Sequence, residues 1–350
     1  MVKAYLRYTG DRSLGVITSR ECNVVVDRSG KYALTGAVEA VSVWNVRQSV
    51  LVRDLKVAKA SERVTRLCLQ EVDSRPVVAA GYSDGAVRVW DYEQGQVLHT
   101  FQGHKSGVSC LAFDRAGHFL ASGSNDTDIV LWDLAAEAGA ARLRGHADQV
   151  TAVLFWQVAA HGAAGAAASA GAASTLGPAG RLISASKDRV IRIWSIELQI
   201  CLQTIAEHQT EVWALALNGA QTRLAAGSAD KFLRLWRLRP SAAGSDEDPL
   251  AELMGELPRP NGQGAALGLR FVRPKNIDFE VLLCQGGGKT LEMFRCHDES
   301  DIKRRQKRRK RRQQEKRKRK SGEAGGEAED AADAADNADA ADAADAADAA

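Results

Sequence analysis

Histidine, serine and aspartate recur along this 350-residue chain at fixed distances from a tryptophan. Trp132 and Trp194 each have an aspartate six residues earlier and a serine ten residues earlier, in units that open with a histidine. The two complete sets are His104, Ser122, Asp126 and Trp132, and His146, Ser184, Asp188 and Trp194; a third keeps His208, Asp230 and Trp236 but has Ala226 for the serine. Side chains of these types support either nucleophilic catalysis by a triad or a structural hydrogen-bond network.

The recurrence of the set decides between these two kinds of site. A catalytic triad needs one exposed serine beside an oxyanion hole, and an enzyme has no use for several copies of it. Here the set repeats from unit to unit, always with a tryptophan whose indole N–H needs a partner when it is buried. We therefore interpret the sets as structural networks, and we expect neither an enzyme nor a cofactor.

The stretch Gly103–Leu134 shows how one unit is built. Apolar and β-branched runs at Val108–Phe113, Phe119–Ser122 and Ile129–Trp132 predict three short strands, separated by turn residues at 114–117 and 125–127. A single sheet of this kind cannot bury both of its faces, so it needs copies of itself on either side.

Six copies of the unit follow one another along the chain. Their closing aromatics are spaced by 42 to 46 residues, or by 58 and 62 where extra residues intervene: Trp44, Trp90, Trp132, Trp194, Trp236 and Phe294. The spacing matches the WD40 period, and the residues resemble WD repeats. The resemblance implies an all-β propeller over residues 1–298, in which Asp holds His, His meets Ser, and Ser meets Trp.

Six blades are recognisable, whereas the resembled family suggests a ring of seven. Because no further strand pattern follows Phe294, we expect an open or poorly filled seventh position and a chain that is prone to associate.

Three segments depart from the repeat. Residues 159–179 are almost wholly Ala and Gly, which predicts a surface insert without a function of its own. Residues 240–262 are polar with prolines, and we interpret them as a loop leaving the propeller. The run Gln285–Thr290 ends like a phosphate-binding loop, but Leu283 replaces the required glycine and a strand pattern follows it, which favours a hairpin turn.

The formal net charge of +3 hides a split between two C-terminal segments. Residues 299–320 predict a polybasic helix, and residues 321–350 hold ten acidic residues in an Ala-Ala-Asp repeat that predicts a disordered tail. The basic segment suits both nuclear import and RNA contact. Its fourteen cations are Lys303, Arg304, Arg305, Lys307, Arg308, Arg309, Lys310, Arg311, Arg312, Lys316, Arg317, Lys318, Arg319 and Lys320.

Composition excludes several classes of protein. The sequence has no apolar run long enough for a transmembrane helix, and its six cysteines lack CxxC spacing. We therefore expect a soluble intracellular protein with no membrane partner, no metal site and no small-molecule substrate.

A more specific resemblance rests on the order of several motifs. They are YLRY at Tyr5–Tyr8, NDTDI at Asn125–Ile129, EVW at Glu211–Trp213, and LEMF running into the basic segment. In that order they resemble the N-terminal half of the tandem-propeller WD-repeat proteins of UTP-B type in the small-subunit processome, over about residues 1–312. The resemblance implies a nucleolar scaffold whose partners are other UTP-B-type processome proteins, U3 snoRNA and pre-rRNA. The family's second propeller and helical region have no counterpart here, so we expect a fragment or a shortened chain.

The alternative function belongs to another class, the substrate receptors of cullin-type ubiquitin ligases or another generic protein-interaction scaffold. Many such receptors end a blade in Trp-Asp-x-Arg. Here the blade ends read Trp90-Asp-Tyr-Glu, Trp132-Asp-Leu-Ala and Trp236-Arg-Leu-Arg, and none of them fits the motif.

Overall fold

The computed structural model describes residues 18–19, 22–57, 62–72, 75–157, 180–239, 249–260, 264–274, 279–288, 290–297, 304 and 307–313. Its strands form six antiparallel sheets in chain order. Five sheets have four strands each, and the sixth has three in the described residues. The only helical residues described are 304 and 307–313. The described residues contain no helix with the length and apolar character that crossing a membrane requires.

The first three sheets contain strands β1 to β12. Sheet one has β1 (Val25–Val26), β2 (Tyr32–Ala37), β3 (Ala40–Asn45) and β4 (Val50–Leu55). Sheet two has β5 (Val64–Val72), β6 (Arg75–Tyr82), β7 (Val87–Asp91) and β8 (Gln96–Phe101). Sheet three has β9 (Val108–Phe113), β10 (Phe119–Ser124), β11 (Ile129–Asp133) and β12 (Ala138–Leu143), so the three strands expected between Gly103 and Leu134 are confirmed.

The last three sheets contain strands β13 to β23. Sheet four has β13 (Val150–Gln157), β14 (Gly180–Ser186), β15 (Ile191–Ser195) and β16 (Ile200–Ile205). Sheet five has β17 (Val212–Leu217), β18 (Arg223–Ser228), β19 (Phe232–Leu238) and β20 (Ala251–Pro258). Sheet six has β21 (Ala266–Val272), β22 (Val281–Gly286) and β23 (Leu291–Arg295).

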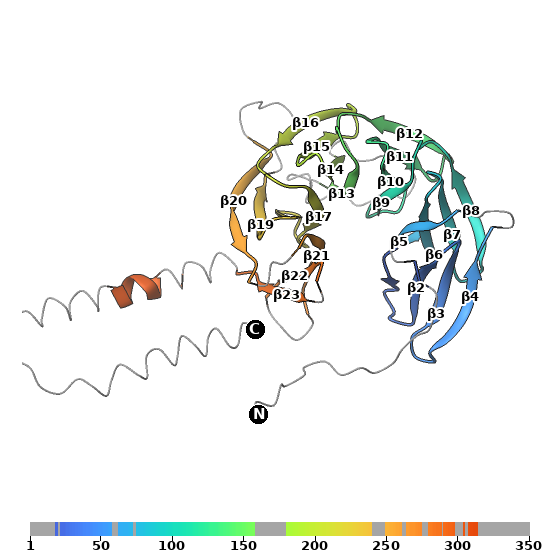
Figure 1. Cartoon of the computed structure of the whole chain (residues 1–350), viewed down its shortest axis with the longest axis horizontal. Helices are drawn as coiled ribbons and strands as arrows, with labels where there is room; N and C mark the ends of the chain where they lie inside the picture. Colours follow the sequence, from blue (N-terminus) through green and yellow to red (C-terminus); the bar gives the residue numbers. More distant parts are fainter. Residues whose placement is uncertain are drawn as a thin grey trace, which may run out of the picture.

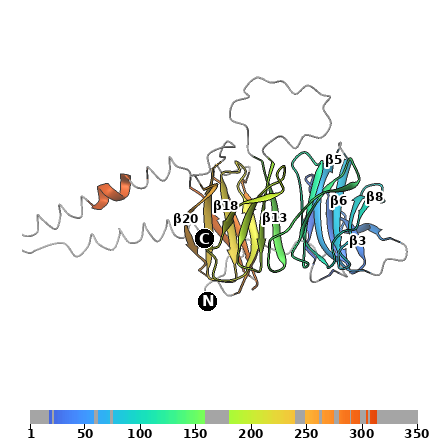
Figure 2. The same ribbon diagram turned by 90° about the horizontal axis from the view of Figure 1, so that it is seen from above.

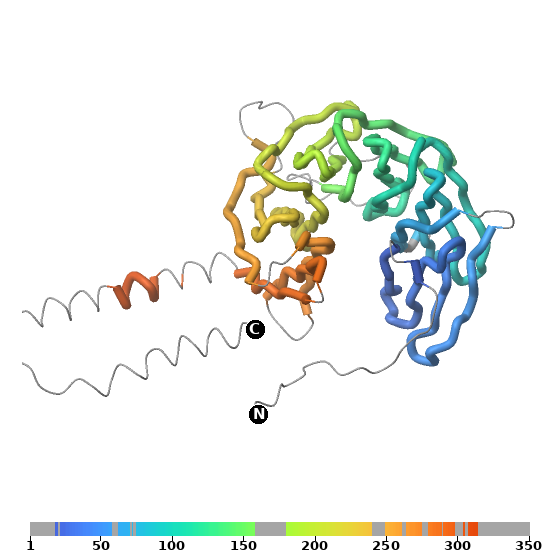
Figure 3. Tube along the Cα trace, viewed as in Figure 1, coloured from blue at the N-terminus to red at the C-terminus, as the bar shows by residue number. Residues whose placement is uncertain are grey.

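The six sheets stand side by side around an arc (Figure 1). The first strands of the sheets, such as β5, β9 and β13, lie on the inner side, and the fourth strands, such as β4 and β16, lie on the rim. Seen from above, the strands run roughly along the axis of the arc (Figure 2). The chain thus travels once around an open propeller from the first sheet to the sixth (Figure 3).

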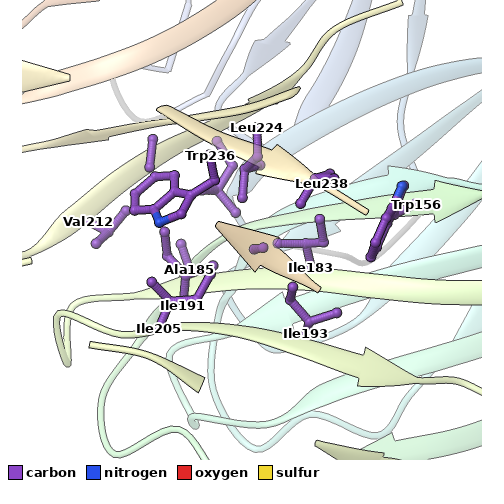
Figure 4. Packing of buried hydrophobic residues seen from close by; sticks show 13 residues of the cluster. Trp156, Ile183, Ala185, Ile191, Ile193, Ile205, Val212, Leu224, Trp236 and Leu238 are labelled. Atoms are coloured by element: carbon purple, nitrogen blue, oxygen red, sulfur yellow. The ribbon is translucent and has the colours of Figure 1, made fainter. Parts of the chain in front are cut away.

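Each closing aromatic from Trp90 onwards packs against the sheet that precedes its own. Trp236 is fully buried in a cluster with Ile183, Ala185 and Ile191 of sheet four, and Figure 4 shows its indole beside Val212 and Ala185. Trp90, Trp132, Trp194 and Phe294 pack in the same way on sheets one, two, three and five. Apolar burial between consecutive sheets therefore holds the arc together.

A glycine in the second strand lets the next sheet approach closely. A Cβ added to Gly123 would lie 2.6 Å from Cys110 Sγ and 2.7 Å from a methyl group of Val150, which opens sheet four. Gly36, Gly81 and Gly227 occupy the same position in their sheets and face Val64, Val108 and Ala266 in the same way. At these four glycines a larger residue would push neighbouring sheets apart, whereas sheet four has Ala185 at this position.

The two ends of the arc lack this packing. Leu291 and Met293 of β23 match the fully buried Ile191 and Ile193 of β15, counted from the closing aromatic, yet they are 57% and 41% exposed. At the other end, Trp44 lines an open hollow of about 510 Å³ beside sheet one. No contact between described strands of sheets one and six is comparable in extent to those between neighbouring sheets. The expected open seventh position is therefore confirmed for the described part of the chain.

Two interpretations of the segments outside the repeat can be compared with the structure. Reading all of residues 240–262 as a loop was wrong, because Ala251–Pro258 forms β20 and pairs with β19. The polar composition of the segment suggested a loop. However, the edge of β19 offers unpaired backbone N–H and C=O groups, and the segment pairs with them through its own backbone. The hairpin at Gln285–Thr290 is confirmed, since β22 and β23 pair across it. The insert at 159–179 lies outside the described residues.

Candidate interaction surfaces and the networks that position them

The first complete set forms one hydrogen-bond chain in sheet three. Trp132 Nε1 donates to Ser122 Oγ at 2.8 Å, and Ser122 Oγ lies 2.8 Å from His104 Nε2. His104 Nδ1 lies 3.1 Å from Asp126 Oδ2, so it carries the proton that this carboxylate accepts. Burial, opposed by Asp126, lowers the pKa of His104, which keeps the ring neutral and leaves Nε2 to accept from the serine hydroxyl.

The second set repeats this geometry in sheet four. Trp194 Nε1 donates to Ser184 Oγ at 2.8 Å, His146 Nε2 lies 2.7 Å from the same hydroxyl, and His146 Nδ1 lies 2.8 Å from Asp188. Burial raises the pKa of Asp188, but hydrogen bonds from His146 and the Ala147 N–H outweigh it and bring the pKa to about 2. The carboxylate is therefore ionised at any physiological pH.

The third set has a different arrangement, with an arginine at its centre. Arg234 Nη1 lies 2.8 Å from His208 Nδ1 and 2.9 Å from Asp230 Oδ2, so it bridges the two residues that were expected to pair directly. Trp236 Nε1 donates to Glu207 Oε2 at 3.2 Å, because Ala226 offers no hydroxyl. Burial first, and then the Arg234 charge, lower the pKa of His208 to about 4.

The remaining sheets have other residue types at the position of the serine. Counting along the strand pairs, Thr35, Ala80 and Cys284 occupy the place of Ser122. Trp44 Nε1 donates to Thr35 Oγ1 at 3.2 Å, whereas Trp90 Nε1 has no partner among the described residues. In sheet six, burial raises the pKa of the Cys284 thiol to about 11.

The sequence analysis did not single out several residues that complete these arrangements. Arg88, Arg192, Arg234 and Glu292 all stand two residues before a closing aromatic, and aligning the units on that aromatic would have revealed the shared position. Arg259 Nε donates to Glu292 at 2.8 Å, and both side chains are almost fully buried. Only the fold reveals this last pair, since Arg259 and Glu292 lie 33 residues apart.

The networks fix the turns of sheets three and four. Asp126 accepts from the backbone N–H of Lys105 at 2.8 Å and of Asp128 at 3.1 Å, so it ties the entry of sheet three to its β10–β11 turn. Asp188 does the same for sheet four with the N–H groups of Ala147 and Val190. Ser122 and Ser184 are fully buried and cannot reach a substrate. The geometry therefore positions surface turns and provides no exposed nucleophile.

The basic segment is described only in part. Arg304, Lys307, Arg308, Arg309, Lys310, Arg311 and Arg312 are helical and exposed. The remaining predicted cations lie outside the described residues: Lys303, Arg305, Lys316, Arg317, Lys318, Arg319 and Lys320. The acidic tail at 321–350 also lies outside them. Among described residues, no group of His, Cys, Asp or Glu could hold a metal ion.

Comparison with protein families gives a match over residues 31–238, to the model described as the WDR3 first beta-propeller domain. The chain belongs to this family. The matched region begins just before β2 and ends with β19, so it contains all three His-containing sets.

Two curated relatives agree with this assignment. The WD repeat-containing protein 3 homolog of Dictyostelium discoideum is 38% identical over 108 residues, covering 31% of this chain and 11% of the relative. The U3 small nucleolar RNA-associated protein 12 of Saccharomyces cerevisiae is 29% identical over 323 residues, covering 88% of this chain and 32% of the relative. The matches thus span a third or less of the length of these relatives.

Other similarities reflect the WD40 fold more broadly. The nuclear distribution protein PAC1 of Arthroderma otae is 33% identical over 167 residues, covering 47% of this chain and 34% of the relative. Among solved structures, the computationally designed Ika8 protein superposes with a TM-score of 0.56 at 21% identity, covering 78% of this chain and 70% of that one. This last likeness shows the fold alone.

Proposed function

We propose that this chain is a non-enzymatic WD40 scaffold of nucleolar small-subunit ribosome biogenesis. The observation that carries the proposal is the match of 88% of the chain to a protein named for its association with U3 small nucleolar RNA. Its partners are then other processome proteins of UTP-B type, U3 snoRNA and pre-rRNA, and its place is the nucleolus. The membership in the WDR3 family supports the same assignment.

The chemistry of the surface supports a binding role. The serines that resemble nucleophiles are fully buried, while the described part of the basic segment is exposed. Lysine and arginine side chains on one exposed helix suit the phosphates of RNA, and binding of this kind releases counterions. The basic segment is therefore the proposed site of both RNA contact and nuclear import.

The test is the salt dependence of RNA binding. Replacing Lys307, Arg308, Arg309 and Lys310 by glutamine should weaken RNA binding and reduce the slope of log affinity against log salt by about 3. The matched control replaces four exposed cations of the sheets, Arg63, Arg75, Arg115 and Lys231, by glutamine. Equal slopes in the wild type and both variants would contradict a role of the basic segment in RNA contact.

A cellular measurement tests the specific partners. Crosslinking the tagged protein in cells and sequencing the bound RNA should enrich U3 snoRNA and pre-rRNA. Enrichment of neither RNA, or recovery of a cullin ligase in place of processome proteins, would overturn the proposal.

A further inference from the structure

A ladder of hydroxyl groups joins neighbouring sheets at the inner edge of the arc. Thr65 Oγ1 of β5 donates to Val108 O of the next sheet at 2.6 Å, and Thr151 Oγ1 of β13 donates to Val212 O at 2.6 Å. Ser109 of β9 makes the same bond to Val150 O. Each hydroxyl residue is the second residue of the inner strand of its sheet.

Tryptophan breaks this ladder in the fifth sheet. Trp213 is the second residue of β17, and its side chain cannot make the short bond that Thr151 makes. Its indole N–H is buried and has no partner among the described residues. Packing alone would be served by threonine here, as it is in sheets two and four, so the large ring with an unused donor needs another explanation.

The ring lies in a hollow at the inner edge of the arc. The hollow has a volume of about 500 Å³, which is enough for one nucleotide, and its lining comes from five sheets. No carboxylate lines it, and besides apolar groups its lining residues are Thr65, Arg66, Ser109, Asn125, Gln149, Thr151 and Trp213. Its size and polarity suit a small planar ligand with hydrogen-bonding edges.

One cation lies over the aromatic ring, and a second lines the hollow. Lys187 Nζ lies 4.8 Å from the centroid of the Trp213 ring. Arg66 lines the hollow. Arg66 also lines a second hollow of about 500 Å³ that includes Arg270 and one carboxylate, Asp27. Positive charge therefore continues from one hollow into the next.

The buried networks hold the polar lining in place. Asn125 precedes Asp126 and Lys187 precedes Asp188, the two carboxylates that the histidines hold. Backbone bonds add to this, since Asn125 N donates to Gly107 O and Lys187 N donates to Gln149 O, both at 3.0 Å. Rigid turns thus hold the Asn125 amide in the lining of the hollow and the Lys187 ammonium against the Trp213 ring, which reduces the entropy cost of binding.

We propose that this hollow binds one nucleotide of a single-stranded RNA, with its base stacked on Trp213. The side-chain amides of Asn125 and Gln149 offer donors and acceptors to the base edge, and Arg66 and Lys187 face the phosphates. An acidic peptide would use the two cations but would leave the aromatic ring and both amides without a role. The proposal rests on the RNA binding proposed above, but on a different surface.

The experiment measures the affinity of the whole chain for a fluorescein-labelled 12-nucleotide oligouridine and for a 12-residue oligoglutamate peptide. Trp213→Thr restores the residue type of β5 and β13, so the fold should be retained, which the melting temperature verifies. Loss of one base–aromatic stack should weaken RNA binding roughly 5- to 100-fold. Trp213→Tyr keeps a stacking surface and should retain most of the affinity.

The same variants are measured with Lys307, Arg308, Arg309 and Lys310 replaced by glutamine, which separates the two proposals. A loss caused by Trp213→Thr in both backgrounds supports the hollow, even if the basic-segment changes have no effect. Unchanged RNA affinity in Trp213→Thr overturns the inference while leaving the basic segment untouched. Weakened peptide binding with unchanged RNA binding also overturns it and identifies the hollow as a peptide site.

Discussion

Replacing Asp126 by alanine tests whether the His–Ser–Asp–Trp sets stabilise the fold. The Asp126 side chain is only 7% exposed and accepts hydrogen bonds from His104 Nδ1, Lys105 N and Asp128 N. Its loss leaves the imidazole N–H buried without a partner, since the His104 side chain is fully buried. The two backbone N–H groups belong to surface turns, where water can replace the carboxylate.

The magnitude follows from the single donor that water cannot reach. An unsatisfied buried donor costs about 1–3 kcal/mol, so the free energy of unfolding should fall by that amount. For a domain of this size the melting temperature should drop by about 2–10 °C. Part of the loss should be recovered in Asp126→Asn, because an amide oxygen can still accept from His104.

Differential scanning calorimetry and urea unfolding measure this effect directly. The matched control is Asp148→Ala, which removes an exposed carboxylate before β13 whose bond partner within the described residues is the neighbouring Gln149 N–H. The control should melt within about 1 °C of the wild type. If Asp126→Ala and Asp148→Ala melt together with the wild type, the network contributes nothing to stability and the reasoning is refuted.

Two further predictions concern pH and the ends of the arc. Because the pKa of His208 is about 4 in the fold and about 6.5 when unfolded, the unfolded state binds the proton first, so stability should fall by about 3 kcal/mol between pH 6.5 and 4. Urea unfolding should show a smaller pH slope in His208→Gln, and an equal slope would contradict the pKa assignment. Replacing Leu291 and Met293 by glutamate should reduce self-association in analytical ultracentrifugation. The same change at Leu198 and Leu202, exposed on the rim, should not.

The sequence predicted those features that repeat from unit to unit. The strands of sheet three and the six closing aromatics could be placed because turn residues and period-two patterns mark them. The hydrogen-bond partners in sheets three and four are those that the resemblance to WD repeats implies, with Trp132 bonded to Ser122 and Trp194 bonded to Ser184.

Features that depend on substitution within the repeat were harder to predict. Nothing in the spacing indicates that Arg234 will stand between His208 and Asp230, which pair directly in the complete sets. The strand Ala251–Pro258 was missed because a rim strand is exposed on much of its surface and lacks an apolar alternation. Such strands are specified by the unpaired edge of the neighbouring strand more than by their own residues.

The packing rule also determines how stability is distributed along the arc. Each sheet buries one face against the preceding sheet, through its closing aromatic, and the other face against the following sheet. Sheets two to five have both contacts, whereas sheet one exposes the side of Trp44 and sheet six exposes Leu291 and Met293. In such a linear array stability is a sum of sheet and interface terms, so the terminal sheets open at lower free energy than the middle ones.

The two complete networks lie in sheets three and four, where they hold turns that local opening at the ends does not reach. The hollow around Trp213 takes Asn125 and Gln149 from these same two sheets, and of its lining only Leu267 belongs to a terminal sheet, so opening of sheet six would remove one apolar side chain and leave the polar lining in place.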